Sequence, residues 1–186
     1  MTAHLKVARA GMFDTLQDLG RIGFMALGMP TAGAQDRVAL RLANALCGNP
    51  ADTAGLEIGV MGPDLLVEAE SVRVALVGPL SPTLIEKPDA PPKPLESDRT
   101  HLLKRGQVLR VGMVEGSSTA YLTVAGGFTL PAFMGSLSTY ARAGIGGYEG
   151  RKLAGKRQRV TGRREEAGAA VRLRQRAGAR RLGAAG

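Results

Sequence analysis

The sequence predicts a mainly β protein, a barrel or sandwich of short strands with one clear α-helix at about residues 36–47. Short runs of Val, Leu and Ile recur between residues 55 and 124, and Gly or Pro lies between several of them. This spacing favours an all-β domain over alternating strands and helices. Trp is absent and aromatic residues make up 4% of the chain, so aliphatic side chains must fill the core. The length of 186 residues suggests one domain.

The expected strands follow from the apolar runs in chain order. Leu5–Val7 alternates with polar neighbours and predicts a first strand that ends near Gly11. Phe13–Asp18 is short and is either a second strand or a loop, and glycines then mark a long irregular segment. The Pro-rich stretch Lys87–Pro94 is expected to be a loop. The remaining strands are expected at Gly55–Val60, Leu65–Ala69, Val72–Val77, Val108–Val111 and Ala120–Val124.

The helix at 36–47 has both start and stop signals. Asp36 is a suitable N-cap, whose carboxylate can accept from the free N–H groups of the first turn. Gly48 can take the left-handed conformation that ends a helix, and Pro50 prevents continuation. Arg37 and Arg41 sit together on one side. Another face is shared by Val38, Leu42, Ala45 and Leu46.

The charge is divided unevenly along the chain. Residues 1–150 hold 13 Lys and Arg against 14 Asp and Glu, whereas residues 151–186 hold 12 against 2. We therefore expect a near-neutral folded domain at 1–153 and a basic, disordered Ala/Gly/Arg-rich tail at 154–186. Nucleic-acid binding through that tail would be salt-sensitive and lost on its deletion. The neutral domain argues against it.

Compartment signals point to the cytoplasm. Cys47 is the single cysteine, which excludes an intrachain disulfide and fits a reducing compartment. The N-terminus lacks the continuous apolar stretch of a signal peptide. An uncharged run at Gly116–Ala141 is long enough to span a bilayer, but half of it is Gly, Ser, Thr or Pro. We interpret it as strand plus loop.

Three polar regions carry candidate chemistry. In the first, Thr15, Gln17, Asp18 and Arg21 form either a strand end with an Asp turn or a set that orients a polar substrate and stabilises negative charge. The third region is Gly135–Arg151, which is either a structured turn region or a loop that binds oxyanions. The side chains that could bind an oxyanion are Ser136, Ser138, Thr139, Arg142, Tyr148 and Arg151.

The second of the three polar regions is Gly33–Asp36 together with the start of the predicted helix. Asp36 is a cap, and the helix N-terminus is also a ready anion site; Asn44 follows on the same helix. Glu57, inside an apolar strand, points to solvent or acts as a general base or ligand at a barrel mouth.

Several common sites are excluded. The glycines at 144 and 146 fail the dinucleotide pattern, and no P-loop is present. His4 and His101 lack metal-ligand spacing, so no metal site is expected. Cys47 lies at a helix C-terminal end, where the dipole disfavours a thiolate, and is expected to be a buried structural thiol.

Five ordered motifs resemble the biotin-dependent carboxyltransferase / allophanate hydrolase subunit 2-like family over roughly residues 1–153. They are T-L-Q-D-L-G-R at 15–21, G-A-Q-D followed by A-L-R-L-A-N-x-L-x-G-N-P within 33–50, L-E-I at 56–58, Y-L-T-V-A-G-G at 121–127 and G-S-x-S-T-Y-x-R-A-G-x-G-G-Y-E-G-R at 135–151. The family includes the C subunit of the bacterial ATP-dependent 5-oxoprolinase and half of the carboxyltransferase domain of urea carboxylase.

The resemblance implies a cyclophilin-like β-barrel and a role as a hydrolase subunit acting on a cyclic amide C–N bond, with 5-oxo-L-proline cleaved to L-glutamate as the leading case. It implies a companion allophanate hydrolase subunit 1-like protein, a third subunit, and ATP at the level of the complex, with no metal or biotin site in this chain. The alternatives are a urea/allophanate-type carboxyltransferase subunit and a non-catalytic partner-binding regulatory module.

The resemblance also nominates site residues. Arg21 and Arg142 would bind a substrate carboxylate or carbonyl oxygen, and Asp18 or Glu57 would manage protons. The catalytic candidates are therefore Asp18, Glu57 and Arg21, and the substrate-binding candidates are Gln17, Asp36, Asn44, Ser138, Arg142 and Arg151.

The chain departs from the family pattern at three points. Leu137 stands where Arg is frequent, which removes a bidentate anion contact. Val77–Pro79 stands where a T-G-A-like strand end is usual. Family members run to about twice this length, so we expect a truncated chain whose tail after about residue 151 is out-of-frame translation. Resequencing the locus around codon 150 tests this.

Overall fold

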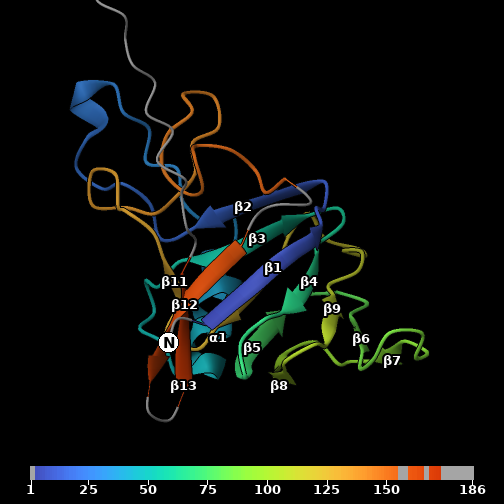
Figure 1. Ribbon diagram of the computed structural model, residues 1–186. Coiled ribbons are helices and arrows are strands. Elements are labelled where there is room, and N and C mark those ends of the chain that lie inside the picture. Colours follow the sequence, from blue (N-terminus) through green and yellow to red (C-terminus); the bar gives the residue numbers. More distant parts are fainter. Residues whose placement is uncertain (1–2, 155–158, 166–167, 173–186) are drawn as a thin grey trace, which may run out of the picture.

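Two β-sheets face each other, and one helix covers the outer face of the smaller sheet (Figure 1). The structure, a computed structural model, describes residues 3–154, 159–165 and 168–172. The smaller sheet has the order β2 (Phe13–Gln17), β3 (Gly55–Gly59), β10 (Ala120–Val124), β5 (Ser71–Val77) and β8 (Arg99–Lys104). The larger has the order β11 (Phe128–Thr129), β13 (Gly168–Arg172), β12 (Arg159–Glu165), β1 (Ala3–Arg9), β4 (Asp64–Val67), β9 (Val108–Arg110), β6 (Thr83–Ile85) and β7 (Lys93–Pro94).

The main core lies between the sheets. Strand alternation sends Leu56 and Ile58 of β3 inward, where they meet Leu16 of β2 and Leu122 of β10. The opposite face of the same strands carries Glu57 and other polar groups toward the helix side. Because side chains alternate along β3, Leu56 and Ile58 face the core while Glu57 faces the opposite side of the sheet.

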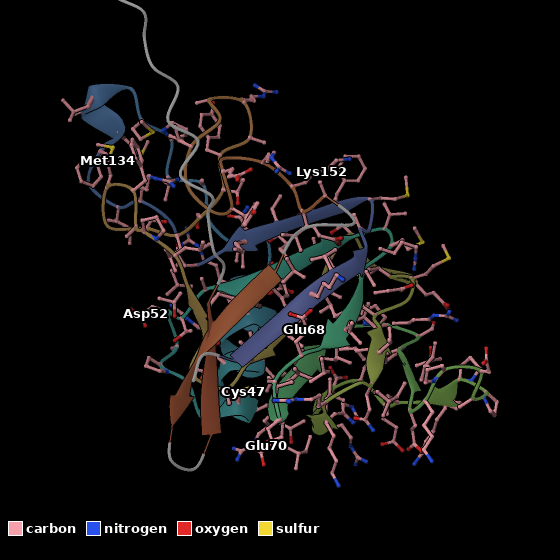
Figure 2. The ribbon with its side chains drawn as sticks, viewed as in Figure 1. Cys47, Asp52, Glu68, Glu70, Met134 and Lys152 are labelled. Carbon is pink, nitrogen blue, oxygen red and sulfur yellow. The ribbon has the colours of Figure 1, made fainter. Side chains whose placement is uncertain are left out.

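The helix α1 (Arg37–Cys47) confirms the predicted element and its caps. One Asp36 oxygen accepts from Val38 N and Ala39 N, both at 2.9 Å, and Gly48 has a φ of 73°. The side chain of Cys47 (labelled in Figure 2) is buried, as expected, and burial raises the pKa of its thiol.

The helix packs mainly with a face other than the one that Val38, Leu42, Ala45 and Leu46 share, although Leu46 is partly buried against the same cluster. Its buried residues are Leu40, Ala43, Asn44 and Cys47, and Val38 is 75% exposed. Leu40 and Ala43 pack against Val77 and Tyr121 of the smaller sheet. Because apolar residues occur on both sides of this helix, their spacing alone does not identify the side that packs against the sheet.

The predicted strands are confirmed within one or two residues, and Phe13–Asp18 is a strand, β2. The 116–141 run contains β10, β11 and loops. Among the described residues, no helix combines the length and apolarity needed to cross a membrane. In the predicted tail, β12 and β13 pair with β1 through their backbones, and residues 155–158, 166–167 and 173–186 lie outside the described part.

Sequence patterns missed β6, β8 and the two-residue strand β7, which pairs with β6 at the end of the stretch 87–94 that was expected to be a loop. The edge strand β8, R-T-H-L-L-K, is mostly exposed and pairs with β5 across a separation of some thirty residues. The strand β8 has too few apolar residues to show a strand-like alternation in the sequence. It forms because it pairs with the neighbouring strand β5.

Candidate functional site

Two loops far apart in sequence meet beyond the end of β2. One follows β2 at Asp18, and the other is the segment 133–151 (Figure 1). The Asp18 carboxylate joins them. Its Oδ1 accepts from Ser136 Oγ at 2.7 Å, Ser138 Oγ at 2.5 Å and Gly20 N at 2.8 Å, and its Oδ2 accepts from Leu137 N at 2.6 Å.

Arg21 also joins the two loops, because it follows β2 and bonds to the segment 133–151. We call Gln17, Asp18, Arg21, Ser136 and Ser138 the Asp18 cluster. Arg21 is 1% exposed, and its guanidinium donates from Nε to the carbonyl of Phe133 at 3.2 Å and from Nη2 to the carbonyl of Ser138. Its Nη1 is buried without a hydrogen-bond partner in the described part of the chain. Burial lowers the pKa of Arg21, and the nearby Asp18 charge opposes that effect.

Glycine is required where the loop crosses this guanidinium. A Cβ at Gly146 would collide with Arg21 Nη2 and with the backbone oxygen of Ser138. Beside the guanidinium, a hollow of about 330 Å³ is lined by Phe133 and Gly146, which both contact Arg21, and by other residues of 131–132 and 144–150. Arg21 itself does not line this hollow; Phe133 and Gly146 lie between the guanidinium and the open space.

Gln17 supplies an open acceptor in the same cluster. Its Nε2 donates to Thr15 Oγ1 at 2.9 Å and to the carbonyl of Thr139 at 3.2 Å. Its Oε1 is buried and has no hydrogen-bond partner among the described residues. Buried polar atoms are seldom left unpaired without a reason. The Asp18 cluster thus lacks partners for one cationic donor and one amide acceptor.

A second cluster forms around Glu57. Its Oε2 accepts from Gln35 N at 2.7 Å and from Tyr121 OH at 2.6 Å, and the Tyr121 oxygen accepts from Asp36 N at 2.8 Å. Burial and the Glu57 carboxylate raise the pKa of the Tyr121 hydroxyl. The preceding amide, Ala34 N, donates to the carbonyl of Asp18 at 2.8 Å. The two clusters therefore flank one short segment at the N-terminus of α1.

Asn44 does not join either cluster. It is fully buried, its Nδ2 donates to the carbonyl of Thr53 at 2.7 Å, and its Oδ1 accepts from Asn49 at 3.2 Å. Asn49 in turn bonds the carbonyl of Val124 and Gly126 N. This geometry fastens the turn after α1 to the end of β10, which favours a structural role for Asn44 over substrate binding.

We expect Asn44→Ala to lower the free energy of unfolding by about 2 kcal/mol, because Thr53 and Asn49 lose partly buried hydrogen bonds to a fully buried side chain. Urea denaturation measures the loss. Arg41→Ala, at an exposed position on the same helix, serves as the control and should change stability little. Equal stability of the two variants would contradict the structural role.

The other predicted arginines lie at the surface of the loop. Arg142 is exposed, and Arg151 forms an ion pair with Glu149 at 2.6 Å while its guanidinium lies 5.5 Å from the centre of the Tyr148 ring. Neither contacts the Asp18 cluster through any interaction found within residues 3–154. Leu137, the departure from the family pattern, contributes its backbone N–H to Asp18 whatever its side chain.

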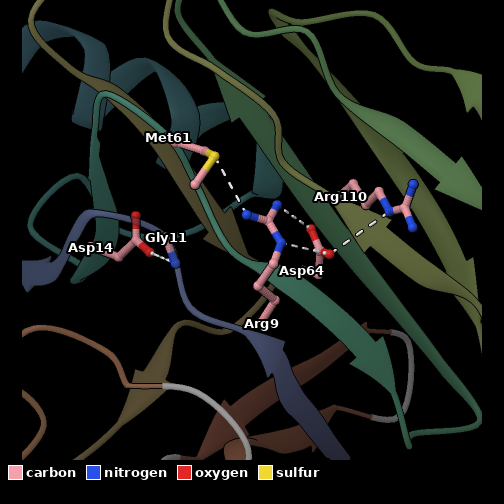
Figure 3. A network of polar contacts seen from close by, with 6 residues as sticks. All are labelled: Arg9, Gly11, Asp14, Met61, Asp64 and Arg110. Carbon is pink, nitrogen blue, oxygen red and sulfur yellow. Dashed lines mark hydrogen bonds and ion pairs between the residues drawn. The ribbon is translucent and has the colours of Figure 1, made fainter.

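Asp14 is a buried carboxyl that the sequence reasoning passed over. It shares the inward face of β2 with Leu16, an alternation that was readable from the sequence, and it is 1% exposed. Its Oδ2 accepts from Gly11 N at 2.8 Å, and its Oδ1 has no partner within the described ranges (Figure 3). Burial raises the pKa of this carboxyl to about 7, although Gly11 N, Lys152 and Arg9 oppose the rise.

We expect Asp14 to make stability fall as pH rises. The ordinary pKa of 3.8 applies to the unfolded chain and about 7 to the folded one, so the folded state binds more protons between these values. The free energy of unfolding should then drop by up to about 4 kcal/mol from pH 4 to pH 7 through this group. Urea denaturation against pH measures the slope, and Asp14→Asn should remove this contribution. Parallel curves for the two proteins would contradict the expectation.

Among the described residues, no three His, Cys, Asp or Glu side chains are grouped in a way that could hold a metal ion.

Comparison with known proteins gives these features a context. Residues 27–181 match the family described as the carboxyltransferase domain, subdomain A and B. The chain is 41% identical over 150 residues to the C subunit of 5-oxoprolinase from Escherichia coli, covering 80% of this chain and 46% of that protein. It is 34% identical over 149 residues to urea amidolyase of Lachancea kluyveri, covering 80% of this chain and 8% of that protein.

A solved structure supports the same family relationship. The crystal structure of K. lactis urea amidolyase superposes with a TM-score of 0.75 at 36% identity, over 82% of this chain and 9% of that one. The chain therefore spans less than half the length of each of these relatives.

Proposed function

The chain belongs to the family of carboxyltransferase domains, subdomains A and B, and we propose that it is a subunit of an ATP-dependent complex that hydrolyses 5-oxo-L-proline to L-glutamate. Relatives of the chain are named as the C subunit of 5-oxoprolinase and as urea amidolyase. Both names denote enzymes or enzyme subunits that act on amide-type C–N bonds. The choice between the substrates rests on the Asp18 cluster.

The unpartnered Arg21 nitrogen is the observation that carries the proposal. A buried cation is costly unless each of its donors is paired, and the Asp18 oxygens are occupied by other donors. 5-Oxoproline has a carboxylate that can supply the missing acceptor, whereas urea is neutral. We propose that the open amide oxygen of Gln17 accepts from the ring N–H of the substrate.

The remaining roles follow from which groups are occupied. Both oxygens of Asp18 accept from a total of four donors, so we assign Asp18 to holding the loop whose Phe133 and Ser138 carbonyls bind Arg21. Glu57 is half-buried and bonded to a hydroxyl, which makes it the better candidate for proton transfer. Ring opening needs water added across the C–N bond, with a proton delivered to the leaving nitrogen. Asp36, Ser138, Arg142 and Arg151 are proposed as substrate contacts on the family resemblance alone, because Asp36 caps α1, Ser138 is bonded to Asp18 and both arginines lie at the surface.

We place ATP elsewhere in the complex. Backbone N–H groups of the glycine-rich loop already donate to carbonyls of the same loop. Gly147 N donates to the carbonyl of Leu137 at 2.9 Å, and Gly150 N donates to the carbonyl of Gly146 at 2.8 Å. A phosphate cradle needs such amides free. A companion allophanate hydrolase subunit 1-like protein and a third subunit would complete the cytoplasmic enzyme.

The test is turnover by a reconstituted complex. The purified chain, its companion and the third subunit are mixed with 5-oxoproline and ATP, and glutamate is measured. We expect glutamate only when ATP and all subunits are present. Carboxylation or cleavage of urea by the same mixture would favour the urea-type alternative. Binding of the partners with no turnover of either substrate would favour a regulatory module.

A further inference from the structure

Val60 holds a strained backbone conformation at the surface. Its φ is +67°, and of the six non-glycine residues with positive φ in the described part it is the β-branched one. Met61 N donates to the carbonyl of Gly59 at 2.8 Å across it, which makes Val60 the centre of the rare, strained γ-turn of positive φ. Val60 is 45% exposed, so burial within this chain does not offset the strain.

Other exposed apolar side chains surround this turn. Met12 N donates to the carbonyl of Met61 at 2.9 Å, Met61 forms a β-bridge with Met113, and Phe13 pairs with Gly59. We call Met12, Phe13, Val60 and Met113 the Val60 patch; these residues are 45–59% exposed. The patch lies at the start of β2, whereas the Asp18 cluster lies beyond its other end, so a partner can bind here without covering the hollow.

The rim of the Val60 patch is mainly cationic. Lys152 Nζ lies 5.2 Å from the centre of the Phe13 ring and donates to the carbonyl of Met12 at 3.0 Å. Arg9 reaches Met61 Sδ at 3.4 Å and shares Asp64 with Arg110, at 2.8 and 3.7 Å (Figure 3). One further carboxylate, Glu115, is bonded to a serine. At the surface of this end, three cations thus face two carboxylates, and the buried Asp14 carboxyl lies near Arg9 and Lys152.

We propose that the Val60 patch is the docking surface for the companion protein, which presents an apolar segment flanked by acidic side chains. The identity of this partner rests on the proposed function. Strain retained at an exposed apolar tip is expected where the tip enters a partner's pocket. Methionine and aromatic side chains suit the centre of such an interface, and basic residues suit its edge against acidic groups.

The test compares binding of the purified companion allophanate hydrolase subunit 1-like protein to the full chain and to Val60→Asn. Asparagine accepts positive φ, so the variant should fold at least as well while losing the apolar tip. We expect its Kd to rise at least tenfold. Lys152→Glu should also weaken binding, and the wild-type Kd should rise with salt. Leu102→Asn, at an exposed position on β8, is the matched control and should bind like the wild type.

The outcomes separate this inference from the function it rests on. Tight binding that survives Val60→Asn and Met113→Asn would overturn the docking surface and leave the proposed complex intact. Absence of binding by the wild-type chain would overturn the proposed partnership together with this surface. Thermal unfolding of each variant, measured alongside, shows that loss of binding is not loss of fold.

Discussion

Arg21→Met is expected to lower kcat/KM of the assembled complex for 5-oxoproline by about 10²- to 10³-fold. The guanidinium is buried, its Nη1 has no hydrogen-bond partner among the described residues, and the hollow lies beyond Phe133 and Gly146, so in the proposed function the substrate carboxylate would lose a desolvated charged partner. Removing one member of such a pair typically costs about 2–5 kcal/mol. Steady-state kinetics of the variant complex measures the loss.

The difficulty with this variant is that Arg21 also holds the carbonyls of Phe133 and Ser138. A purely structural role could therefore lower activity as well. The uncharged carboxamide of 5-oxoproline resolves the two roles. The wild-type complex should prefer the carboxylate by a large factor, and Arg21→Met should abolish that preference. Arg99→Met, an exposed arginine paired with Glu96 on β8, should leave both values unchanged. A wild-type complex indifferent to the carboxylate would show that Arg21 does not bind it.

Local signals were sufficient for the helix and the central strands. Asp36 and Gly48 mark the two ends of α1 by side-chain and backbone chemistry within a few residues of the chain. The run Ala120–Val124 is fully buried, and continuous apolar character identifies such a strand. The face of α1 was not predictable in this way, because Leu40 and Leu42 are equally apolar and only the sheet distinguishes them.

The site was predictable in its residue types but not in its geometry. Asp18 and Ser138 were both candidates, yet 120 residues separate them and no local pattern joins them. Whether Asp18 is a free base or a filled acceptor depends on the donors that the fold brings to it. The same holds for Arg21, whose unpaired nitrogen exists only because the loop at 133–146 closes over it. Burial of Asp14 was readable from its alternation with Leu16, but its missing partner was not.

Asp18→Asn is expected to lower the free energy of unfolding by about 3 kcal/mol and to loosen the segment 133–151. The two carboxylate oxygens face different fixed backbone donors, Gly20 N and Leu137 N. An asparagine amide has one oxygen, so either orientation of its NH₂ opposes a backbone N–H. The serine hydroxyls can rotate, but the backbone donors cannot. Leaving a buried donor unsatisfied costs about 1–3 kcal/mol, and a charged acceptor is lost as well.

Urea denaturation and limited proteolysis of the loop would measure the effect of Asp18→Asn. Asp52→Asn, at an exposed position, makes the same chemical change and should alter stability by less than about 0.5 kcal/mol. Ser138→Ala removes one donor to Asp18 and should fall between the two, because the remaining three donors stay in place. If Asp18→Asn were as stable and as resistant to protease as Asp52→Asn, the carboxylate would not be what holds the two loops together. Asp18 would then return as a candidate for proton transfer.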